Sequence, residues 1–422
     1  MLQVTKIREQ IDFVKERLAV KNFKPMEVID EIVQLDDQRK SIQKSLDDIL
    51  SESNQISKQI GDLFKQGKKA EADALKEGSI ALKDRTALLS QSLKEVEIAL
   101  EDKLVTVPNL PYHLVPKGKT PEENEVVRSY GDIPTLPENA LAHWDLATKY
   151  KLFDLDLGVK ITGAGFPVYT RQGAKLQRAL INFFLDHATD QGYGEVVPPY
   201  MVNRDSAFAT GQIPDKEGQM YYTQDEFYLI PTAEVPITNI YRDVIVQETD
   251  FPIMMTGYSP CFRREAGSYG KDVRGLNRVH QFDKVEIVQI AHPDKSYEVL
   301  EQMLSYVESL LVKLELPYRV LRLCGGDMTF SSSMTYDLEV FSAAQKRWLE
   351  VSSVSNFETY QANRLKVRFK GKDGKTQLAH TLNGSALALP RIVASILENH
   401  QTPEGIRIPE ALRKYTGFDF IV

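Results

Sequence analysis

The sequence predicts an α+β protein in which a mainly antiparallel β-sheet, flanked by helices, follows an N-terminal antiparallel α-helical coiled coil. Apolar residues at heptad spacing fill most of the first hundred positions. A proline-rich segment then reads as a linker, and the later strand-like and helix-like stretches show no regular βαβ alternation, which favours an antiparallel sheet. The expected domains are residues 1–110 and residues 111–422.

The composition indicates a globular protein of ordinary polarity. Its 422 residues suggest two or three domains, and a net charge of −7 excludes a globally basic, nucleic-acid-coating surface. Two cysteines, Cys261 and Cys324, are too few for a disulfide framework or a multi-cysteine zinc site, so no zinc is expected. Neither a signal-like apolar segment nor a membrane-length apolar run occurs, and the predicted location is the cytoplasm.

Between residues 26 and 102, apolar residues recur three, four or seven positions apart, and Gly67 interrupts the pattern once. Two helices of roughly 50–60 Å should therefore fold back on each other as a hairpin. One interpretation is a dimerisation or spacer element, and the other is an arm that reaches a distant partner. Basic side chains near the tip suit contacts with phosphates, although a solvated coiled-coil face explains them nearly as well: Lys58, Lys65, Lys68, Lys69 and Lys76.

The second domain opens at the linker with Pro108, Pro111, Pro116 and Pro121. Helical periodicity, β-branched runs and turn residues then predict alternating elements. In chain order they are a helix over 174–192, strands over 195–202, 254–265 and 279–290, a helix over 296–317, a strand over 349–356, and a strand, turn and helix over 377–401.

No motif for a side-chain nucleophile, a phosphate-binding P-loop or a dinucleotide fold occurs, and the seven histidines are too scattered for a metal cluster. The informative residues are arginines. Arg263 leaves a predicted strand into a loop that adds Lys271, Arg274 and Arg278, and a guanidinium binds two oxygens of a phosphate at once. Arg391, in the first turns of a later helix, suits the far end of a polyphosphate.

Other side chains complete a nucleotide site. Glu350, Ser352 and Ser353 offer the hard oxygen ligands that Mg²⁺ prefers, and Phe282 can stack on a base. Taken singly, each has an ordinary alternative, such as a surface salt bridge, a core aromatic residue or a strand serine.

In combination these stretches resemble bacterial-type seryl-tRNA synthetase, a class II aminoacyl-tRNA synthetase, over essentially the whole chain. Pro199 resembles the proline of class II motif 1, FRREAGSYGKDVRGLNRVHQFDKVE resembles motif 2 with its loop, and NGSALALPRIVASILENHQ resembles motif 3. The TAE run after Pro231 resembles the family's serine-binding signature, and LCGGDM and TYDLEV also match. The hairpin and linker lie where the family has its tRNA-binding arm and hinge.

The resemblance implies a role for each matching position. Arg263 would bind the ATP α-phosphate, Arg391 the γ-phosphate, and Glu350 and Ser353 the Mg²⁺ ion. Glu265 would accept from the adenine amino group, and Phe282 would stack on the ring. The remaining implied ATP contacts are Arg264, Val279, Val351 and Ser352, and the implied serine contacts are Thr232, Ala233, Glu234, Glu286 and Ser385.

The resemblance also implies the reaction and the partners. ATP and L-serine would form seryl-adenylate, and serine would pass to the 3′ end of tRNA(Ser), with tRNA(Sec) open as a second acceptor. A homodimer is expected because motif 1 builds the class II subunit interface. Three rivals are weighed: a homologue that loads a carrier protein, which lacks the arm; a class II enzyme for threonine or proline, which the TAE run opposes; and a coiled-coil interaction protein with a dead catalytic domain, which Arg263, Glu350 and Arg391 oppose.

Three runs depart from the family pattern. Val354 gives SSVSN where the family often has SSCSN, FETYQANRLK replaces a DFQARR-like run, and GAGFPVY replaces a GSRFY-like run. None includes the arginines or carboxylates named above. We therefore expect the substrates to be unchanged and the packing behind the site to differ.

Overall fold

The computed structural model describes residues 1–215, 218–265 and 274–422, and it contains two compact units. Unit 1 consists of Met1–Ala19 and Phe23–Pro108, and unit 2 consists of Val20–Asn22 and Asn109–Val422. Within the described residues, no helix has the length and apolar character needed to cross a membrane.

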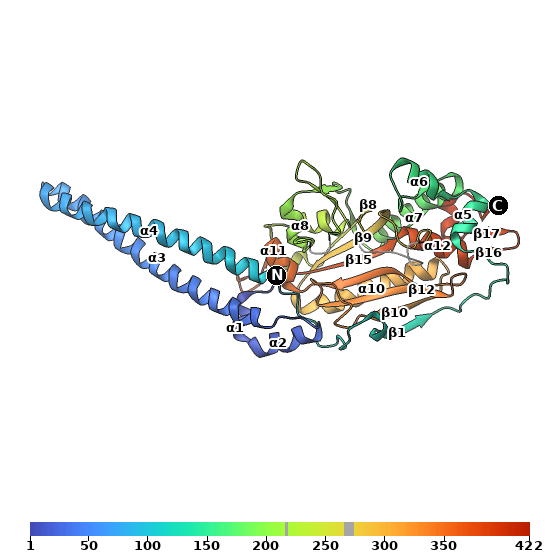
Figure 1. Ribbon diagram of the computed structural model, residues 1–422, viewed down its shortest axis with the longest axis horizontal. Coiled ribbons are helices and arrows are strands. Elements are labelled where there is room, and N and C mark those ends of the chain that lie inside the picture. The colour runs from blue at the N-terminus through green and yellow to red at the C-terminus, as the bar shows by residue number, and fades with distance from the viewer. Residues whose placement is uncertain (216–217, 266–273) are drawn as a thin grey trace. The chain divides into compact units, whose positions relative to one another are not determined.

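Unit 1 is helical, and the predicted hairpin is confirmed. Helices α3 (Glu27–Lys65) and α4 (Lys69–Leu104) lie side by side (Figure 1). The turn between them contains Gly67 at a φ of 75°, a conformation that glycine adopts without steric cost. Two further helices, α1 (Val4–Glu9) and α2 (Ile11–Val20), lie in a stretch whose charged and apolar residues alternate too closely to predict them.

The hairpin packs most tightly at the end away from the turn. Val28, Ile29 and Ile32 in the first turns of α3 are buried, whereas Ile56 and Ile60 near the turn are only half-buried. Two helices alone shield only one stripe of each other, so partial exposure of the seam is expected where no third element packs against it.

Unit 2 is built on an eight-stranded sheet, and the predicted antiparallel architecture is confirmed. Every neighbouring pair in it is antiparallel except β4 and β8, which are parallel. The strands in spatial order are β1 (Glu125–Tyr130), β10 (Tyr318–Arg322), β11 (Met334–Ser342), β12 (Arg347–Asn356), β15 (His380–Ala388), β9 (Gln281–Ala291), β8 (Ile253–Phe262) and β4 (Gly194–Glu195).

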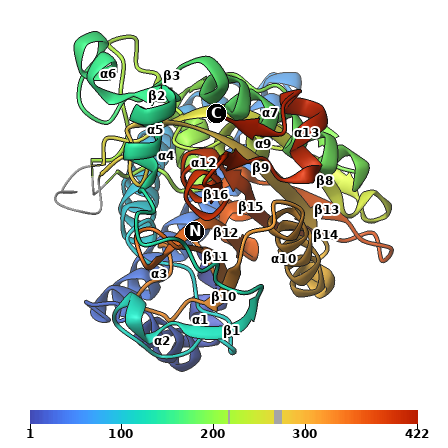
Figure 2. The same ribbon diagram turned by 90° about the vertical axis from the view of Figure 1, so that its right-hand side faces the viewer.

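Three helices cover one face of this sheet: α7 (Arg171–Asp190), α10 (Ser296–Lys313) and α12 (Leu389–Asn399) (Figure 2). Their apolar side chains share one core with Val285 and Ile287 of β9. Because side chains alternate along a strand, the residues between and beside these two, Lys284 and Glu286, face the other side. The polar face of the sheet is therefore the candidate for a site.

Smaller elements surround the sheet. Those used below are α5 (His143–Tyr150), α6 (Leu155–Ile161), α9 (Glu234–Asn239), β3 (Val168–Tyr169) and β5 (Met201–Val202). The others are β2 (Phe153–Asp154), α8 (Arg204–Thr210), β6 (Tyr228–Leu229), β7 (Ile245–Gln247), α11 (Thr359–Leu365), β13 (Arg368–Lys370), β14 (Thr376–Leu378), β16 (Gln401–Thr402), β17 (Gly405–Arg407), α13 (Glu410–Thr416) and β18 (Phe420–Ile421).

Two local predictions are wrong. The strand expected over 195–202 is interrupted: β4 ends at Glu195 and β5 begins at Met201, because Pro198 and Pro199 have no N–H to donate to a ladder. The turn expected between the last strand and its helix is also wrong. Residues 383–385 lie inside β15, and α12 follows directly with Pro390 in its first turn, where proline suits a helix.

Candidate active site

The predicted serine contacts Glu286 and Ser385 and the predicted metal ligand Ser353 lie in one row across four neighbouring strands, together with Asp337, which the sequence did not single out. Glu286 on β9 is the register partner of Ser385 on β15, and Ser353 on β12 is the register partner of Asp337 on β11. Val354 pairs with Gly384, so Ser353 and Ser385 lie next to each other. Cross-strand partners share a face of the sheet. All four side chains therefore lie on the polar face.

A β-bulge places Glu350 on this face as well. Ser352 pairs with Leu338 and Glu350 pairs with Glu339, so Val351 is an extra residue in β12. In a regular strand, positions 350 and 353 would point to opposite faces. The extra residue restores Glu350 to the side of Ser353 and turns Val351 into the core, where it is 1% exposed.

Arg391 joins this end of the site from α12. Its Nη1 donates to the main-chain oxygen of Glu350 at 2.6 Å and lies 3.6 Å from Glu350 Oε2. Its Nε donates to the main-chain oxygen of Asn277 at 2.9 Å. The predicted metal carboxylate and the predicted phosphate arginine are therefore neighbours, although they are 41 residues apart in the chain.

Arg263 directly follows the last residue of β8. Its N–H donates to the main-chain oxygen of His280, and its Nε donates to that of Pro231 at 3.3 Å. The guanidinium carbon lies 5.2 Å from the ring centroid of Phe282, within the range of a cation–π contact. The predicted phosphate ligand and the predicted base-stacking residue are thus in contact.

The next residues of this loop are less enclosed. Oε2 of Glu265 accepts from Nε of Arg278, so the carboxylate predicted to receive the adenine amino group already has a partner. The side chain of Arg264 is exposed, and Val279 is buried. Lys271 lies outside the described residues, as do all of 266–273.

The predicted serine pocket is a buried polar cluster. The Thr232 hydroxyl donates to Glu286 Oε2 at 3.2 Å and accepts from Lys284 Nζ at 2.9 Å. Gln361 Nε2 donates to Glu234 Oε1 at 2.7 Å. Ala233, between the two ligand candidates of its own run, is fully buried. The cluster offers two carboxylates, an ammonium and a hydroxyl in one place.

Burial dominates the acid–base properties of these carboxylates. It raises the pKa of Glu234 to about 7, and the charge of Glu286 raises it further while Gln361 opposes the shift. Burial also raises the pKa of Glu286 above its ordinary value, against the lowering effects of Lys284 and Thr232. A bound ammonium group between the two would favour their charged forms.

Lys284 is the member of this cluster that the sequence reasoning missed. Its Nζ lies 2.6 Å from Glu286 Oε2, and both side chains are almost fully buried. The signal was available, because residues two apart on a strand share a face. Gln361 was also missed, and its position on a separate helix left no local pattern to find it.

Ser352 is placed differently from the other predicted ligands. Its hydroxyl donates to the main-chain oxygen of Ser385 at 2.6 Å, and the residue is 1% exposed. This hydrogen bond therefore joins β12 to β15. The neighbouring Ser353 instead lies beside Asp337 on the polar face of the sheet. Burial and the charge of Glu350 raise the pKa of Asp337 well above its ordinary value, and Ser353 lowers it.

The described residues contain no cluster of three or more His, Cys, Asp or Glu side chains arranged to bind a metal. One carboxylate and one hydroxyl at Glu350 and Ser353, with the buried Asp337 Oδ1 lacking a hydrogen-bond partner, suit a cation whose other ligands come from substrate oxygens. This donor set has the chemistry that Mg²⁺ prefers.

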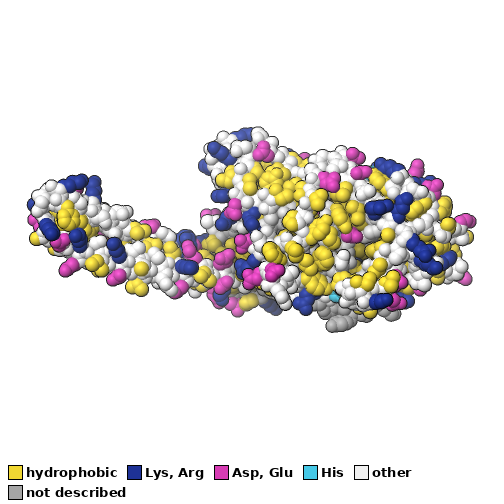
Figure 3. Space-filling view, turned by 90° about the horizontal axis from the view of Figure 1, so that it is seen from above, with side chains coloured by type: hydrophobic (Ala, Val, Ile, Leu, Met, Phe, Trp, Pro, Cys, Tyr) yellow, Lys and Arg dark blue, Asp and Glu magenta, His cyan; other side chains and the backbone are white. Residues whose placement is uncertain are grey.

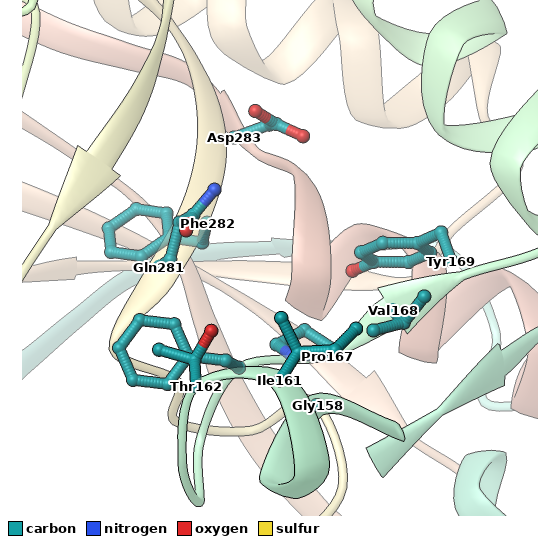
Figure 4. Close-up of a pocket in the computed structure, with 10 residues that line it drawn as sticks. Gly158, Ile161, Thr162, Pro167, Val168, Tyr169, Gln281, Phe282 and Asp283 are labelled. Atoms are coloured by element: carbon teal, nitrogen blue, oxygen red, sulfur yellow. The ribbon is translucent and has the colours of Figure 1, made fainter. Parts of the chain in front are cut away.

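Behind Phe282 lies a cavity of about 210 Å³ (Figure 4). Its walls come from α6, β3, the loop between them and the start of β9, and they include Phe166, Tyr169 and Gln281. The GAGFPVY run, which differs from the family pattern, therefore lines the same cavity as Phe282, the residue predicted to stack on the base. Phe166 stacks on His280 with ring centroids 5.4 Å apart, and His280 in turn donates to the main-chain oxygen of Arg263.

Two family models match the chain. The model described as "Seryl-tRNA synthetase N-terminal domain" matches residues 1–111, and the model described as "tRNA synthetase class II core domain (G, H, P, S and T)" matches residues 220–400. Among curated proteins, the serine–tRNA ligase of Salinibacter ruber is 49% identical over 99% of this chain and 98% of its own length. That of Chlorobaculum parvum is 44% identical over the whole of both chains.

Solved structures agree with the sequence comparisons. The seryl-tRNA synthetase of Pyrococcus horikoshii, complexed with ATP, superposes with a TM-score of 0.92 and 34% identity over 100% of this chain and 99% of that chain. The cytoplasmic serine–tRNA ligase of Naegleria fowleri, in complex with AMP, has a TM-score of 0.87 and 26% identity over 100% and 98% of the two chains.

Proposed function

This chain belongs to the seryl-tRNA synthetase family, and on that premise we propose how its residues perform the family's reaction. It is a serine–tRNA ligase that uses ATP to activate L-serine and then charges tRNA. The observation that carries the residue assignments is the contact of Arg263 with Phe282 and of Arg391 with Glu350 at the edges of one polar sheet face.

In the first step, a serine carboxylate oxygen attacks the α-phosphorus of ATP, and the bond to the bridging oxygen of the β-phosphate breaks to release pyrophosphate. We assign the α-phosphate to Arg263 and the γ-phosphate to Arg391. Since the nucleophile is a substrate carboxylate, the enzyme supplies position and charge stabilisation. In the second step, the tRNA 3′-hydroxyl attacks the acyl carbon and AMP leaves.

The adenine would lie on Phe282, whose ring centroid is 5.2 Å from the guanidinium carbon of Arg263. We assign the adenine amino group to Glu265. Its carboxylate now accepts from Arg278 Nε and would accept from the amino group in addition to, or in place of, that donor. Arg264, Val279, Val351 and Ser352 are close to these groups in the chain, and we assign them supporting contacts with ATP. Since Val279, Val351 and Ser352 are buried, theirs would be made through main-chain atoms.

We assign the serine substrate to the cluster of Thr232, Glu234 and Glu286 with Ser385. Two buried carboxylates suit the α-ammonium group and the side-chain hydroxyl of serine. A site built to pair a hydroxyl rejects an analogue lacking it by up to about 10⁴–10⁵. Glu286 is the proposed acceptor for the serine hydroxyl, because its Oε2 already accepts a hydroxyl proton from Thr232.

We propose that Glu350 and Ser353 hold Mg²⁺ together with ATP oxygens. When bound, the ion would neutralise phosphate charge. Arg391 would then share Glu350 with the ion, since its Nη1 bonds the main-chain oxygen of that residue and leaves the carboxylate partly open to solvent.

We propose that residues 1–110 form the tRNA-binding arm and residues 111–422 the catalytic domain. Exposed lysines at the turn of the hairpin, Lys65, Lys68 and Lys69, suit contacts with a phosphate backbone. Recognition of shape and backbone rather than bases extends the proposal to tRNA(Sec) as a second acceptor. Charging assays with tRNA(Ser) and tRNA(Sec) transcripts test both parts.

We also propose a homodimer. Large apolar side chains are exposed on α6, before β5 and at its first residue: Val159, Ile161, Val197 and Met201. Figure 3 shows hydrophobic side chains gathered on one face of unit 2. Val197 is 82% exposed. Large contiguous apolar patches are rare on the surface of a monomer and often mark an interface with another protein. Sedimentation equilibrium at micromolar concentration tests the dimer.

The two free cysteines suit the reducing conditions of the cytoplasm, where we place the enzyme.

The experiment that tests the function is ATP–pyrophosphate exchange across a panel of amino acids. Serine should support exchange, whereas threonine, proline, alanine and glycine should support far less. Exchange that depends equally on threonine or proline would contradict the proposed pocket, and charging of a carrier protein in place of tRNA would contradict the proposed acceptor.

A further inference from the structure

The loop that resembles motif 2 returns to the sheet through the exit segment, residues 274–277, and this segment contacts a buried polar pair. The pair is His143 at the start of α5 and Glu398 on α12, and both side chains are 0% exposed. Neither belongs to the ligand set proposed above. Nδ1 of His143 lies 2.6 Å from Glu398 Oε1, and its Nε2 accepts from the Leu276 N–H at 2.8 Å.

These two hydrogen bonds assign the tautomer of His143. A main-chain N–H can only donate, so Nε2 is the acceptor and has no proton. Nδ1 then carries the proton and donates it to Glu398. The imidazole is neutral and oriented from both sides, with Glu398 behind it and the exit segment in front.

Gln345 connects the same carboxylate to the next residue of the exit segment. Its Nε2 donates to Glu398 Oε1 at 3.0 Å, and its Oε1 accepts from Asn277 Nδ2 at 2.9 Å. Glu398 therefore acts on Leu276 through His143 and on Asn277 through Gln345. Two adjacent residues of the exit segment are fixed by one buried charge.

Arg391 closes the network into a ring. Its Nε donates to the main-chain oxygen of Asn277 at 2.9 Å. Arg391 and Glu398 lie on the same helix, seven residues and about two turns apart. Glu398 of α12 thus fixes the exit segment, and the exit segment in turn orients the guanidinium of Arg391 on the same helix.

Steric contact shows the same docking independently of the hydrogen bonds. Gly275 has a φ of 66°, and a Cβ added there would lie 2.2 Å from His143 Nε2 and 2.9 Å from Trp144 Cε3. The guanidinium carbon of Arg274 lies 4.3 Å from the Trp144 ring centroid. The exit segment therefore lies directly against the first turn of α5, with no room for a side chain at position 275.

We propose that His143, Glu398 and Gln345 are positioning residues that fix the exit segment and thereby orient Arg391 for the pyrophosphate end of ATP. The inference rests on the proposed function of Arg391. It predicts an effect on ATP that spares serine, because the serine cluster is organised by Lys284, which has no bond to this ring.

Two substitutions at one position separate the two bonds of His143. In His143→Asn, the amide can replace Nδ1 toward Glu398 but leaves the Leu276 N–H without an acceptor. In His143→Gln, the longer amide can bring an oxygen to the Leu276 N–H. In full-length enzyme, pyrophosphate exchange should show an ATP KM raised on the order of tenfold in His143→Asn, with the serine KM within about twofold. His143→Gln should retain more of the ATP affinity.

His400→Asn is the matched control. His400 is buried just after the same helix, and its Nε2–H donates to the main-chain oxygen of Leu314. Since it has no bond to the exit segment, its loss should lower the melting temperature without changing the ratio of the ATP and serine KM values. An equal change of that ratio in His400→Asn and His143→Asn would overturn the inference.

Gln345→Met keeps the experiment decisive if His143→Asn does not fold, because Gln345 is only half-buried. It should raise the ATP KM selectively with little change in melting temperature. An unchanged ATP KM, or an equal rise for ATP and serine, overturns the inference. If wild-type enzyme shows no serine-dependent exchange, the proposed function fails instead, so the two failures are distinguishable.

Discussion

Lys284 and Glu286 form an ion pair of 2.6 Å on β9 with the two side chains 7% and 2% exposed. A buried pair tolerates the loss of one partner poorly, because the other charge is left uncompensated, at a cost of roughly 3–5 kcal/mol. The pair lies next to Thr232, whose hydroxyl accepts from Lys284 Nζ, so a change at either position should affect both stability and the proposed serine pocket.

Glu286→Ala should raise the serine KM much more than the ATP KM in pyrophosphate exchange, because the proposed acceptor of the serine hydroxyl is lost. The variant should also unfold at a lower temperature, since Lys284 loses its partner. Glu286→Gln keeps the volume and one oxygen acceptor and separates the two effects. Equal rises in both KM values would count against the assignment.

Arg263→Ala and Arg391→Ala should each lower the rate of serine activation on the order of 10²–10³-fold, as the loss of a preorganised donor to a reacting group does elsewhere. Arg391→Lys should recover only part of the loss, since an ammonium cannot bond both Glu350 and Asn277 with a planar fork. Arg413→Ala, on α13, is the control. Wild-type exchange rates in both alanine variants would refute the phosphate assignments.

Glu234 should make stability depend on pH. Its pKa is about 7 in the folded protein and 4.5 for a glutamate exposed to water, so between these values the folded state binds more protons than the unfolded state. The free energy of unfolding contributed by this group should therefore fall as pH rises from about 4.5 to 7. Urea denaturation at pH 5 and pH 7.5 should show a smaller loss in Glu234→Gln than in wild type. Identical pH dependence in the two proteins would exclude this source.

Removal of the hairpin, about residues 30–98, should leave serine-dependent pyrophosphate exchange close to wild type and strongly reduce tRNA charging. Unit 2 contains all the proposed ATP and serine residues, which explains the first half of this prediction. Replacing only Lys65, Lys68 and Lys69 by Gln in the intact chain is the finer test. Charging that survives both changes would make the hairpin a spacer.

Periodicity was sufficient for the hairpin and for the two long strands β8 and β9, because each pattern extends over ten or more residues. The strand predicted over 195–202 was wrong because two prolines interrupt it. The turn predicted at 383–385 was wrong because β15 continues through these residues and leads directly into α12. Both errors lie at element boundaries, where few residues carry the pattern.

For the site, residue types predicted Arg263, Arg391 and Glu350, and the family resemblance added Glu234, Glu265 and Glu286. Partners distant in the chain were not predicted. Gln361 reaches Glu234 across 127 residues, and His143 reaches Glu398 across 255. No local spacing encodes such contacts, since they arise only when the sheet has assembled. Lys284 was missed as well, although the alternation along β9 places it on the same face as Glu286.

The bulge at Val351 makes the place of the Glu350 carboxylate a matter of backbone geometry as much as of residue type. If β12 ran through Val351 in a regular ladder, Glu350 would turn into the apolar core and Leu349 would reach the solvent side, although no chemical group had been altered. Deleting Val351, by contrast, would leave Leu349, Glu350, Ser352 and Ser353 opposite their present partners on β11, so the shorter strand would keep the carboxylate beside Ser353.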